Sequence, residues 1–555
     1  MKTATVIQAD LEVTPLGTRS RLADAMHGTP VLRRTVDRAA RLRGIDGLVV
    51  LVPSSQRRAA ERMLDGSAAR VVAHDAPSPP WRALVRTARK WSLDGWRGGL
   101  GGSTCFDEFV DCRLIAEALA DRLDGDVLFI PPAAPLFDPR LAERLIDHRP
   151  ATREEARLAF ATTPPGLSGV VMEGALVREL AAQGVPLGWV FSYKPDAPLR
   201  DLAFQSCCVE IAPEIRYAAG RLMTDTRRSW DLVEALLRDH PDPDAVTACA
   251  WLRRREVDVV EELPREVEIE LTTADPYPES VLRPRGSRVS TRGPINTAVV
   301  ERVVEELAAW DDALIVLGGH GDPLCHSNFE DVLGAIRPRH SDTAARGGVY
   351  GVCLRTTAAG LDDRIIELLI AHEVDVLNVV LDAWTPELYA QLQGPSDPEG
   401  ARLGDVLARL DRLNQAKLER KSVAPIVVPE MAKSPRNVHE LDDFHDGWLR
   451  KLGTVSIVGA SDYAGQFEND RVTSVAPPKR GSCRRLRTRC VVLANGRVTA
   501  CDQDVHGIMT VGDLADASLR DLWRGVPFEK IRDAHRTDRA HSTPLCGRCD
   551  EWHRP

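Results

Sequence analysis

The chain has 555 residues, of which 43% are hydrophobic and 28% are charged, as in a soluble globular protein of about three domains. Its formal net charge of −9 argues against a nucleic-acid partner. No apolar run approaches the roughly 20 residues of a membrane span, and no signal peptide follows Met1, so we predict a cytoplasmic protein with no membrane partner.

Residues 1–190 alternate predicted strands and helices, which is typical of an α/β domain with a parallel sheet. The expected strands are 3–9, 47–52, 70–73 and 126–130, and the expected helices are 31–42 and 55–64. The opening strand, the turn 17–19, the segment 28–32 that leads into a helix, and the strand 45–52 together resemble the nucleotidyltransferase (GT-A-like) fold, which makes activated sugars or CDP-alcohols.

That resemblance implies a loop whose amides cradle phosphates and an Asp that holds Mg²⁺. In this chain the loop carries two carboxylates, Asp10 and Glu12, and the Asp expected after the central strand is missing. We therefore predict a degenerate domain used for binding or scaffolding, with Arg19 and Arg21 as the remaining candidates for phosphate contacts. An active nucleotidyltransferase that holds Mg²⁺ through Asp10 or Asp138 is the alternative.

Residues 191–264 are expected to connect two domains, with helices near 229–237 and 244–254. Residues 265–475 then resemble the central partial (β/α)6 TIM-type barrel of radical-SAM enzymes. The match consists of predicted strands and a Gly-Gly-His-Gly-Asp-Pro-Leu turn at 318–324; the strands are 267–273, 349–357, 376–382 and 426–430.

The resemblance implies that the turn at Gly318 and Gly319 binds the methionine amino group of S-adenosylmethionine (SAM), and Asp322 stands where the family has Glu. The same family builds its radical-generating cluster on C-x3-C-x2-C, because three thiolates leave one iron open for SAM. That pattern occurs nowhere in this chain.

The positions that would hold those cysteines carry Asp275, Glu279 and Leu282, and no cysteine lies between Cys249 and Cys325. Asp and Glu are hard oxygen donors and Leu is no ligand, so we predict that the barrel builds no cluster and has no catalytic residue of the usual kind.

Residues 476–555 form a small Cys-rich domain with the four candidate metal ligands Cys490, Cys501, Cys546 and Cys549. An Asn-Gly hairpin at 495–496 is expected to bring Cys490 and Cys501 together. The segment resembles the four-cysteine form of the SPASM domain, which implies one [4Fe–4S] cluster. Zinc is the alternative, although C-x10-C is wide for structural zinc.

A basic run precedes these ligands: Lys479, Arg480, Arg484, Arg485, Arg487 and Arg489. We expect it to compensate the charge of a cluster or to form a solvated loop, since no aromatic residues interleave the cations as in nucleic-acid sites. A docking surface for an acidic protein or a phosphate-bearing partner is the alternative. Cys483 lies within the run and is the alternative as a spare or substitute ligand, although its spacing fits the family pattern less well than that of Cys490.

The combination of these three domains resembles the spiro-SPASM type of protein. We predict an iron–sulfur protein that binds, scaffolds or relays electrons, with a protein or peptide as its partner. Two enzymatic alternatives stay open: an active radical-SAM/SPASM enzyme that uses SAM to modify a peptide or small molecule, and the nucleotidyltransferase.

Overall fold

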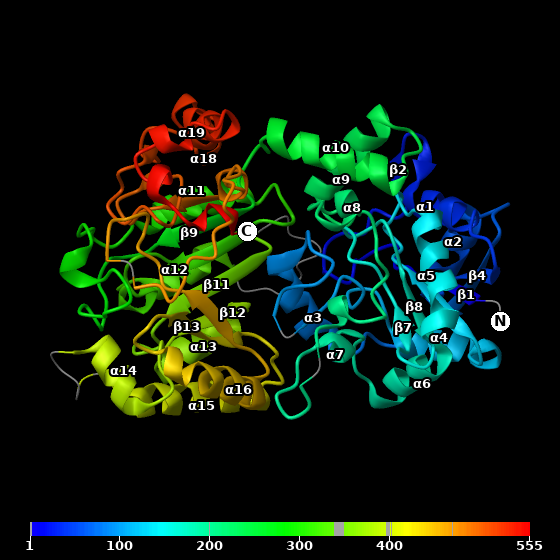
Figure 1. Cartoon of the computed structure of the whole chain (residues 1–555), viewed down its shortest axis with the longest axis horizontal. Helices are drawn as coiled ribbons and strands as arrows, with labels where there is room; N and C mark the ends of the chain where they lie inside the picture. Colours follow the sequence, from blue (N-terminus) through cyan, green and yellow to red (C-terminus); the bar gives the residue numbers. More distant parts are fainter. Residues whose placement is uncertain are drawn as a thin grey trace. The chain divides into compact units, whose positions relative to one another are not determined.

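The computed structural model describes residues 3–100, 102–198, 200–337, 349–395, 400, 402–468 and 470–554. The chain forms two compact units, one built on Met1–Asp258 and one on Val259–Asp342 with Arg346–Pro555. Figure 1 colours the first unit blue to green and the second green to red. None of the helices in the described part of the chain is long and apolar enough to cross a membrane.

The first unit is built on a six-stranded sheet with the order β5-β4-β1-β6-β8-β7. Its strands are β1 (Thr3–Gln8), β4 (Ile45–Pro53), β5 (Ala69–His74), β6 (Asp126–Ile130), β7 (Leu158–Ala159) and β8 (Val170–Glu173). The first four of these are parallel, which confirms the predicted parallel sheet. β8 and β7 extend it antiparallel, a feature that the alternation of elements did not indicate.

The helices of the first unit bury apolar side chains. They include α1 (Val31–Ala39), α2 (Arg57–Met63), α3 (Arg82–Arg89), α4 (Cys112–Ala118), α5 (Pro139–Thr152), α6 (Gly174–Gln183), α9 (Arg227–Asp239) and α10 (Ala245–Asp258). α9 begins at a capping box in which Thr226 and Ser229 exchange hydrogen bonds. Residues from the expected connecting region, such as Leu222 and Leu236, are fully buried in this unit's core.

The second unit contains six parallel strands that follow one another in chain order, as the barrel prediction requires. They are β9 (Glu266–Glu270), β10 (Leu314–Gly318), β11 (Gly351–Thr356), β12 (Val376–Val380), β13 (Ile426–Lys433) and β14 (Ser456–Gly459). The intervening helices include α11 (Thr297–Leu307), α12 (Phe329–Ile336), α13 (Asp363–Ala371), α14 (Pro386–Gln393), α15 (Leu403–Glu419) and α16 (Leu441–Leu452). Carboxyl ends of parallel strands meet at one edge of a sheet, so the loops after them share one site.

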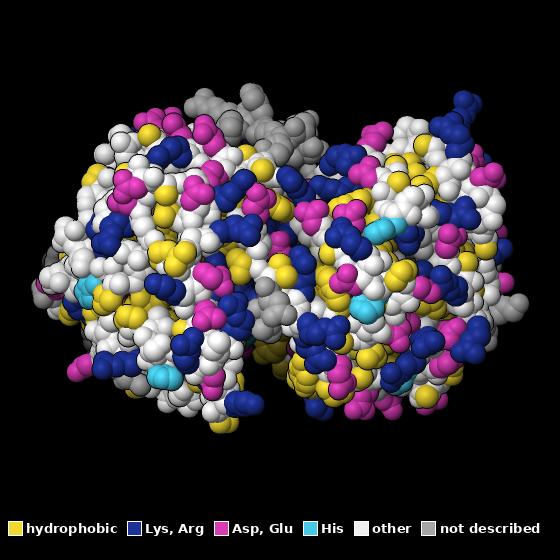
Figure 2. Space-filling view, turned by 90° about the horizontal axis from the view of Figure 1, so that it is seen from above, with side chains coloured by type: hydrophobic (Ala, Val, Ile, Leu, Met, Phe, Trp, Pro, Cys, Tyr) yellow, Lys and Arg dark blue, Asp and Glu magenta, His cyan; other side chains and the backbone are white. Residues whose placement is uncertain are grey.

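The cysteine-rich segment continues the same sheet, because β15 (Arg489–Val492) pairs in parallel with β9. β16 (Arg497–Thr499) and β17 (Thr510–Asp513) follow antiparallel. The remaining helices there are α17 (Arg485–Thr488), α18 (Leu519–Trp523) and α19 (Val526–Arg536), of which α18 contacts both α11 and α19 (Figure 1). Figure 2 shows acidic and basic side chains interspersed on the surface of both units.

Candidate metal centre and the carboxyl ends of the parallel strands

Cys483 lies within electrostatic reach of three other thiols of the second unit, Cys501, Cys546 and Cys549, and these four are called the four-thiol group. Burial is the main cause that raises the pKa of Cys546, and Cys483 and Cys549 raise it further. Burial likewise raises the pKa of Cys549 to about 11, with Cys483 adding to it, and raises that of Cys501, with Asp502 and Cys483 adding to it. Three of the four predicted ligands are thus brought together, and Cys483 joins them.

Cys490 lies apart from this group. It is fully buried in β15, where it pairs with Val267 of β9. Burial raises the pKa of Cys490 to about 12, and the one charged neighbour that shifts it is Arg532 of α19.

The hairpin register explains why Cys490 and Cys501 do not face one another. The predicted hairpin is present, but it pairs Val492 with Val498 and closes with a hydrogen bond from the Leu493 amide to the Arg497 carbonyl at 2.8 Å. This register places Cys490 opposite position 500, one residue short of Cys501. Since neighbouring strand residues point to opposite faces, a shift of one residue separates the two thiols.

Main-chain amides surround the sulfurs of the four-thiol group. The Glu551 amide lies 3.2 Å from Cys549 Sγ, and the Gln503 amide lies 3.5 Å from Cys501 Sγ. The amides of Arg485 and Leu486 hold the pKa of Cys483 below what burial alone would give. Amide donors directed at sulfur are a feature by which proteins stabilise iron–sulfur clusters.

Two side chains next to these thiols carry buried donor atoms that lack hydrogen-bond partners within the described residues. These are Nε and Nη2 of Arg480 and Nε2 of His535. Arg480 Nη1 reaches the carbonyl of Cys549 at 3.3 Å, and His535 Nδ1 accepts from the Cys483 amide at 3.3 Å. Burial, then Arg480, lowers the pKa of His535 to about 4, so Nε2 carries its proton at neutral pH. Unpaired buried donors fit an anionic group held by the thiols.

Two arginines of the basic run form ion pairs within the second unit. Arg485 binds Asp502 at 3.0 Å, and Arg489 lies 3.4 Å from Glu266. Within the described ranges, no three Cys, His, Asp or Glu side chains converge tightly enough to hold a single metal ion.

Two amides and one carbonyl of the Gly-Gly turn after β10 already have hydrogen-bond partners within the protein. The Gly319 amide donates to Glu268 Oε1 at 2.8 Å, and the His320 amide donates to Glu270 Oε2 at 3.1 Å. The Gly319 carbonyl accepts from Nη1 of Arg285 at 3.2 Å. Gly319 has a φ of +88°, and an added Cβ would lie 2.6 Å from Glu270 Cβ, so only glycine fits here.

Asp322 is buried, and its carboxylate accepts hydrogen bonds within the protein. Its carboxylate accepts from the hydroxyls of Thr356 and Thr357 at 2.8 and 2.6 Å and from the Leu324 amide at 3.0 Å. Of the predicted SAM-binding residues Gly318, Gly319 and Asp322, the last two are thus hydrogen-bonded within the protein itself.

Arginines from the segment after β9 fill the carboxyl ends of the parallel strands. Arg283 binds Asp382 at 2.9 and 3.1 Å and Glu430 at 2.9 Å. Arg292 binds both carboxylate oxygens of Glu270 at 2.5 and 3.0 Å. Sequence reasoning missed these residues, although a segment with four arginines between 283 and 292, where the resemblance implies a cysteine loop, was a visible signal.

The three positions that correspond to cluster cysteines do not converge. Asp275 pairs with Arg285 at 2.8 Å, and burial raises its pKa to about 6 despite that partner. Glu279 is exposed, whereas Leu282 is buried in the core. Cys325 follows the Gly-Gly turn directly, and burial raises its pKa to about 11, with Asp322 and Asp275 adding to it.

The four-thiol group and the strand ends adjoin one another. Asp502, which follows Cys501, acts on Glu268 of β9, whose pKa rises to about 7, through burial first and Asp502 second. Gln503 binds the loop after β14 through Ser461 at 2.7 Å and Gln466 at 2.6 Å. Tyr463 of that loop packs against His320 with ring centroids 6.0 Å apart.

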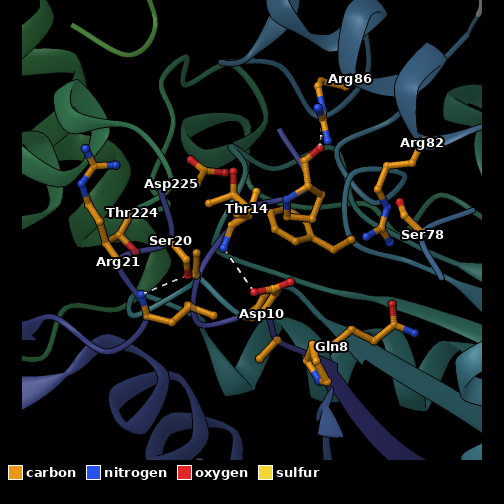
Figure 3. A pocket seen from close by; sticks show the side chains of 18 of the residues that line it. Gln8, Asp10, Thr14, Ser20, Arg21, Ser78, Arg82, Arg86, Thr224 and Asp225 are labelled. Atoms are coloured by element: carbon orange, nitrogen blue, oxygen red, sulfur yellow. Dashed lines mark hydrogen bonds between the residues drawn. The ribbon is translucent and has the colours of Figure 1, made fainter. Parts of the chain in front are cut away.

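In the first unit, two candidate metal ligands have structural roles. Asp10 Oδ1 accepts from the amides of Glu12 and Val13 at 2.9 and 3.2 Å. Asp138 caps α5 through the Arg140 amide at 2.9 Å. Arg19 is tied to Asp24 at the surface, whereas Arg21 lines a cavity of about 220 Å³ at the carboxyl ends of the parallel strands (Figure 3).

Residues 483–550 match the family model of the SPASM domain, an iron-sulfur cluster-binding domain. The match begins at Cys483, the thiol that joins the predicted ligands in place of Cys490. An uncharacterized protein of Treponema pallidum (strain Nichols) is 23% identical over 253 residues, which are 43% of this chain and 65% of that protein.

Two solved structures are similar in part. BtrN in complex with AdoMet and 2-DOIA is 16% identical, with 52% of this chain and 93% of that chain covered and a TM-score of 0.36. A cytidylyltransferase from Leptospira borgpetersenii is 14% identical, with 46% of this chain and 95% of that chain covered and a TM-score of 0.32.

Proposed function

We propose that the protein binds one [4Fe–4S] cluster through Cys483, Cys501, Cys546 and Cys549 and uses it for partner binding or single-electron relay, without cleaving SAM. The bound cluster would supply reversible one-electron chemistry. This chain's own residues would hold it: the thiols as ligands, the amides of Gln503 and Glu551 toward sulfur, and Arg480 and His535 as additional donors.

The observation that carries the proposal is the arginine-filled strand edge. A barrel of the radical-SAM kind needs a second, open cluster and a free Gly-Gly turn at this edge. Here Arg285 takes the Gly319 carbonyl, and Arg283 and Arg292 neutralise carboxylates that line the same edge. We infer that the second unit is a barrel of radical-SAM type that has lost this reaction.

Two further parts of the proposal rest on resemblance. The first unit would be a nucleotidyltransferase-like domain without transferase activity, because Asp10 and Asp138 are both engaged in holding the backbone. A protein or peptide would be the redox or binding partner. The match of residues 483–550 to an iron-sulfur cluster-binding domain supports iron over zinc.

Equilibrium dialysis of the anaerobically purified full chain against labelled SAM tests the proposal. We expect no saturable binding at millimolar SAM and no 5′-deoxyadenosine after reduction with dithionite. Saturable binding together with 5′-deoxyadenosine would instead establish an active radical-SAM enzyme. Zinc in place of iron in the same preparation would overturn the proposed redox role.

A further inference from the structure

The loop that follows β14, residues 460–467 and called the β14 loop below, has a strained backbone. Tyr463, Ala464 and Gly465 have φ angles of +50°, +58° and +78° in succession. Two of these three residues carry a Cβ, which disfavours the left-handed region. A run of this kind persists only where surrounding contacts hold it, so those contacts show what the loop depends on.

The first set of contacts comes from Gln503, which lies two residues after Cys501. Gln503 accepts from the Ser461 hydroxyl at 2.7 Å through Oε1 and from Gln466 Nε2 at 2.6 Å through its carbonyl. Oγ of Ser461 in turn accepts from the Tyr463 amide at 3.0 Å. Gln503 therefore holds the β14 loop on both sides of its left-handed run.

The second set comes from the segment that carries the last two candidate ligands. Asp550, which directly follows the last of them, binds Nη1 of the buried Arg471 at 2.6 Å, and Nη2 of Arg471 binds Asp462 at 2.8 Å. A Cβ on Gly465 would lie 3.2 Å from Cδ of Arg548, so the β14 loop also packs on this segment directly. Neighbours of three candidate ligands thus hold one loop.

The β14 loop also packs on residues at the carboxyl ends of the parallel strands. Tyr463 packs on His320 of the Gly-Gly turn, and Phe467 packs on Tyr463 with ring centroids 5.7 Å apart. The guanidinium carbon of Arg288, from the segment after β9, lies 5.7 Å from the centroid of the Phe467 ring. Ala464 is buried. The β14 loop is therefore seated between the ligand segments and the strand ends.

We propose that the β14 loop is held over the strand ends when the four thiols bind their cluster and is released when they do not. This inference rests on the proposed cluster. In this structure Cys501 Sγ donates to Asp502 Oδ1 at 3.2 Å. A metal-bound cysteine is a thiolate and only accepts, so its sulfur becomes an anionic acceptor for the Gln503 amide 3.5 Å away. Binding thereby fixes the segment from which Gln503 reaches the loop.

Hydrogen exchange of the full chain, measured by mass spectrometry on a peptide that contains the β14 loop, tests this inference. The wild type is compared as purified anaerobically and after removal of iron with a chelator. We expect the loop to exchange at least about tenfold more slowly in the iron-loaded form, because cluster binding and loop opening are coupled.

The variants separate this coupling from a general effect of the cluster on stability. The double variant Gln503→Ala with Asp462→Ala cuts the side-chain links from both ligand segments but keeps the amide that faces Cys501. Its loaded and stripped forms should differ by less than about twofold in loop exchange. The matched control is Gln415→Ala, which removes a surface glutamine that binds Glu419 on α15 and should keep the wild-type difference.

Equal loop exchange in the loaded and stripped wild type would overturn the inference, while about four irons per chain in the loaded form would leave the proposed cluster in place. A wild type without iron would overturn both. A double variant that keeps the full wild-type difference would also contradict the inference. Exchange of the first unit should be the same in all forms and shows whether a variant is folded. If the double variant is not, each single variant should give an intermediate difference, and a full difference in both would contradict the inference.

Discussion

The Arg285 side chain donates a hydrogen bond from Nη1 to the main-chain oxygen of Gly319 at 3.2 Å. Nε of the same side chain lies 2.8 Å from Asp275 Oδ2. One arginine thus joins the segment after β9 to the turn after β10, at the place where the family resemblance implies a bound cofactor.

Replacement of Arg285 by Ala should destabilise the second unit. It leaves the buried carboxylate of Asp275 and the Gly319 carbonyl without this partner, and breaking a buried pair from one side costs about 3 kcal/mol. Urea unfolding at pH 8 would measure this loss. Arg364→Ala is the control, because its pair with Glu330 is exposed and should be worth less than about 1 kcal/mol. Equal effects of the two substitutions would refute a structural role for Arg285.

Cys483 and Cys490, the two candidates for the first ligand position, should behave differently. We predict that Cys483→Ser lowers the iron content of the anaerobically purified protein severalfold, because serine oxygen is a poor substitute for a thiolate ligand. Cys490→Ser should retain the wild-type iron content, since Cys490 packs in β15 away from the other thiols. Circular dichroism of both variants controls for folding. Iron loss in Cys490→Ser alone would restore the ligand set that the sequence indicated.

Asp107 should make the first unit less stable as pH rises. Its carboxylate accepts from the amides of Thr104 and Gly188 at 2.6 and 2.5 Å, but burial raises its pKa to about 7. The folded state therefore keeps a proton that the unfolded state loses above about pH 4. The stabilisation is present below that pH and is lost as pH rises toward 7, by roughly 4 kcal/mol at most.

Asp107→Asn removes this titration. The difference in unfolding free energy between the wild type and Asp107→Asn should therefore shrink between pH 4.5 and pH 7, as followed by urea unfolding. The exposed Asp121→Asn serves as control and should show a difference that does not change with pH. A constant difference for Asp107→Asn as well would contradict the assigned cause.

The order of predicted strands and helices was enough to predict most of the fold, because strands that alternate with helices form parallel sheets. The positions of the cysteine ligands could not be predicted in the same way. A two-residue Asn-Gly turn would have set Cys490 opposite Cys501, but the chain closes the hairpin between Leu493 and Arg497, with Gly496 at a φ of +82°. One residue in the turn decides which face Cys490 takes.

The arginines of both units were harder to foresee. Carboxylates from four different segments pair with Arg283, Arg285 and Arg292. Such pairs depend on the tertiary structure and cannot be predicted from a local sequence pattern. Arg82 likewise reaches the first unit's cavity from a helix that the sequence did not predict. The sequence also did not show that the Asp10 carboxylate accepts hydrogen bonds from amides of its own loop.

The most direct test of the central claim is an anaerobic iron and sulfide analysis of the wild type, with EPR of the dithionite-reduced protein recorded with and without SAM. The structure predicts about four irons per chain, one [4Fe–4S]⁺ signal, and no change in that signal when SAM is added. About eight irons per chain, or a second signal that shifts with SAM, would contradict it.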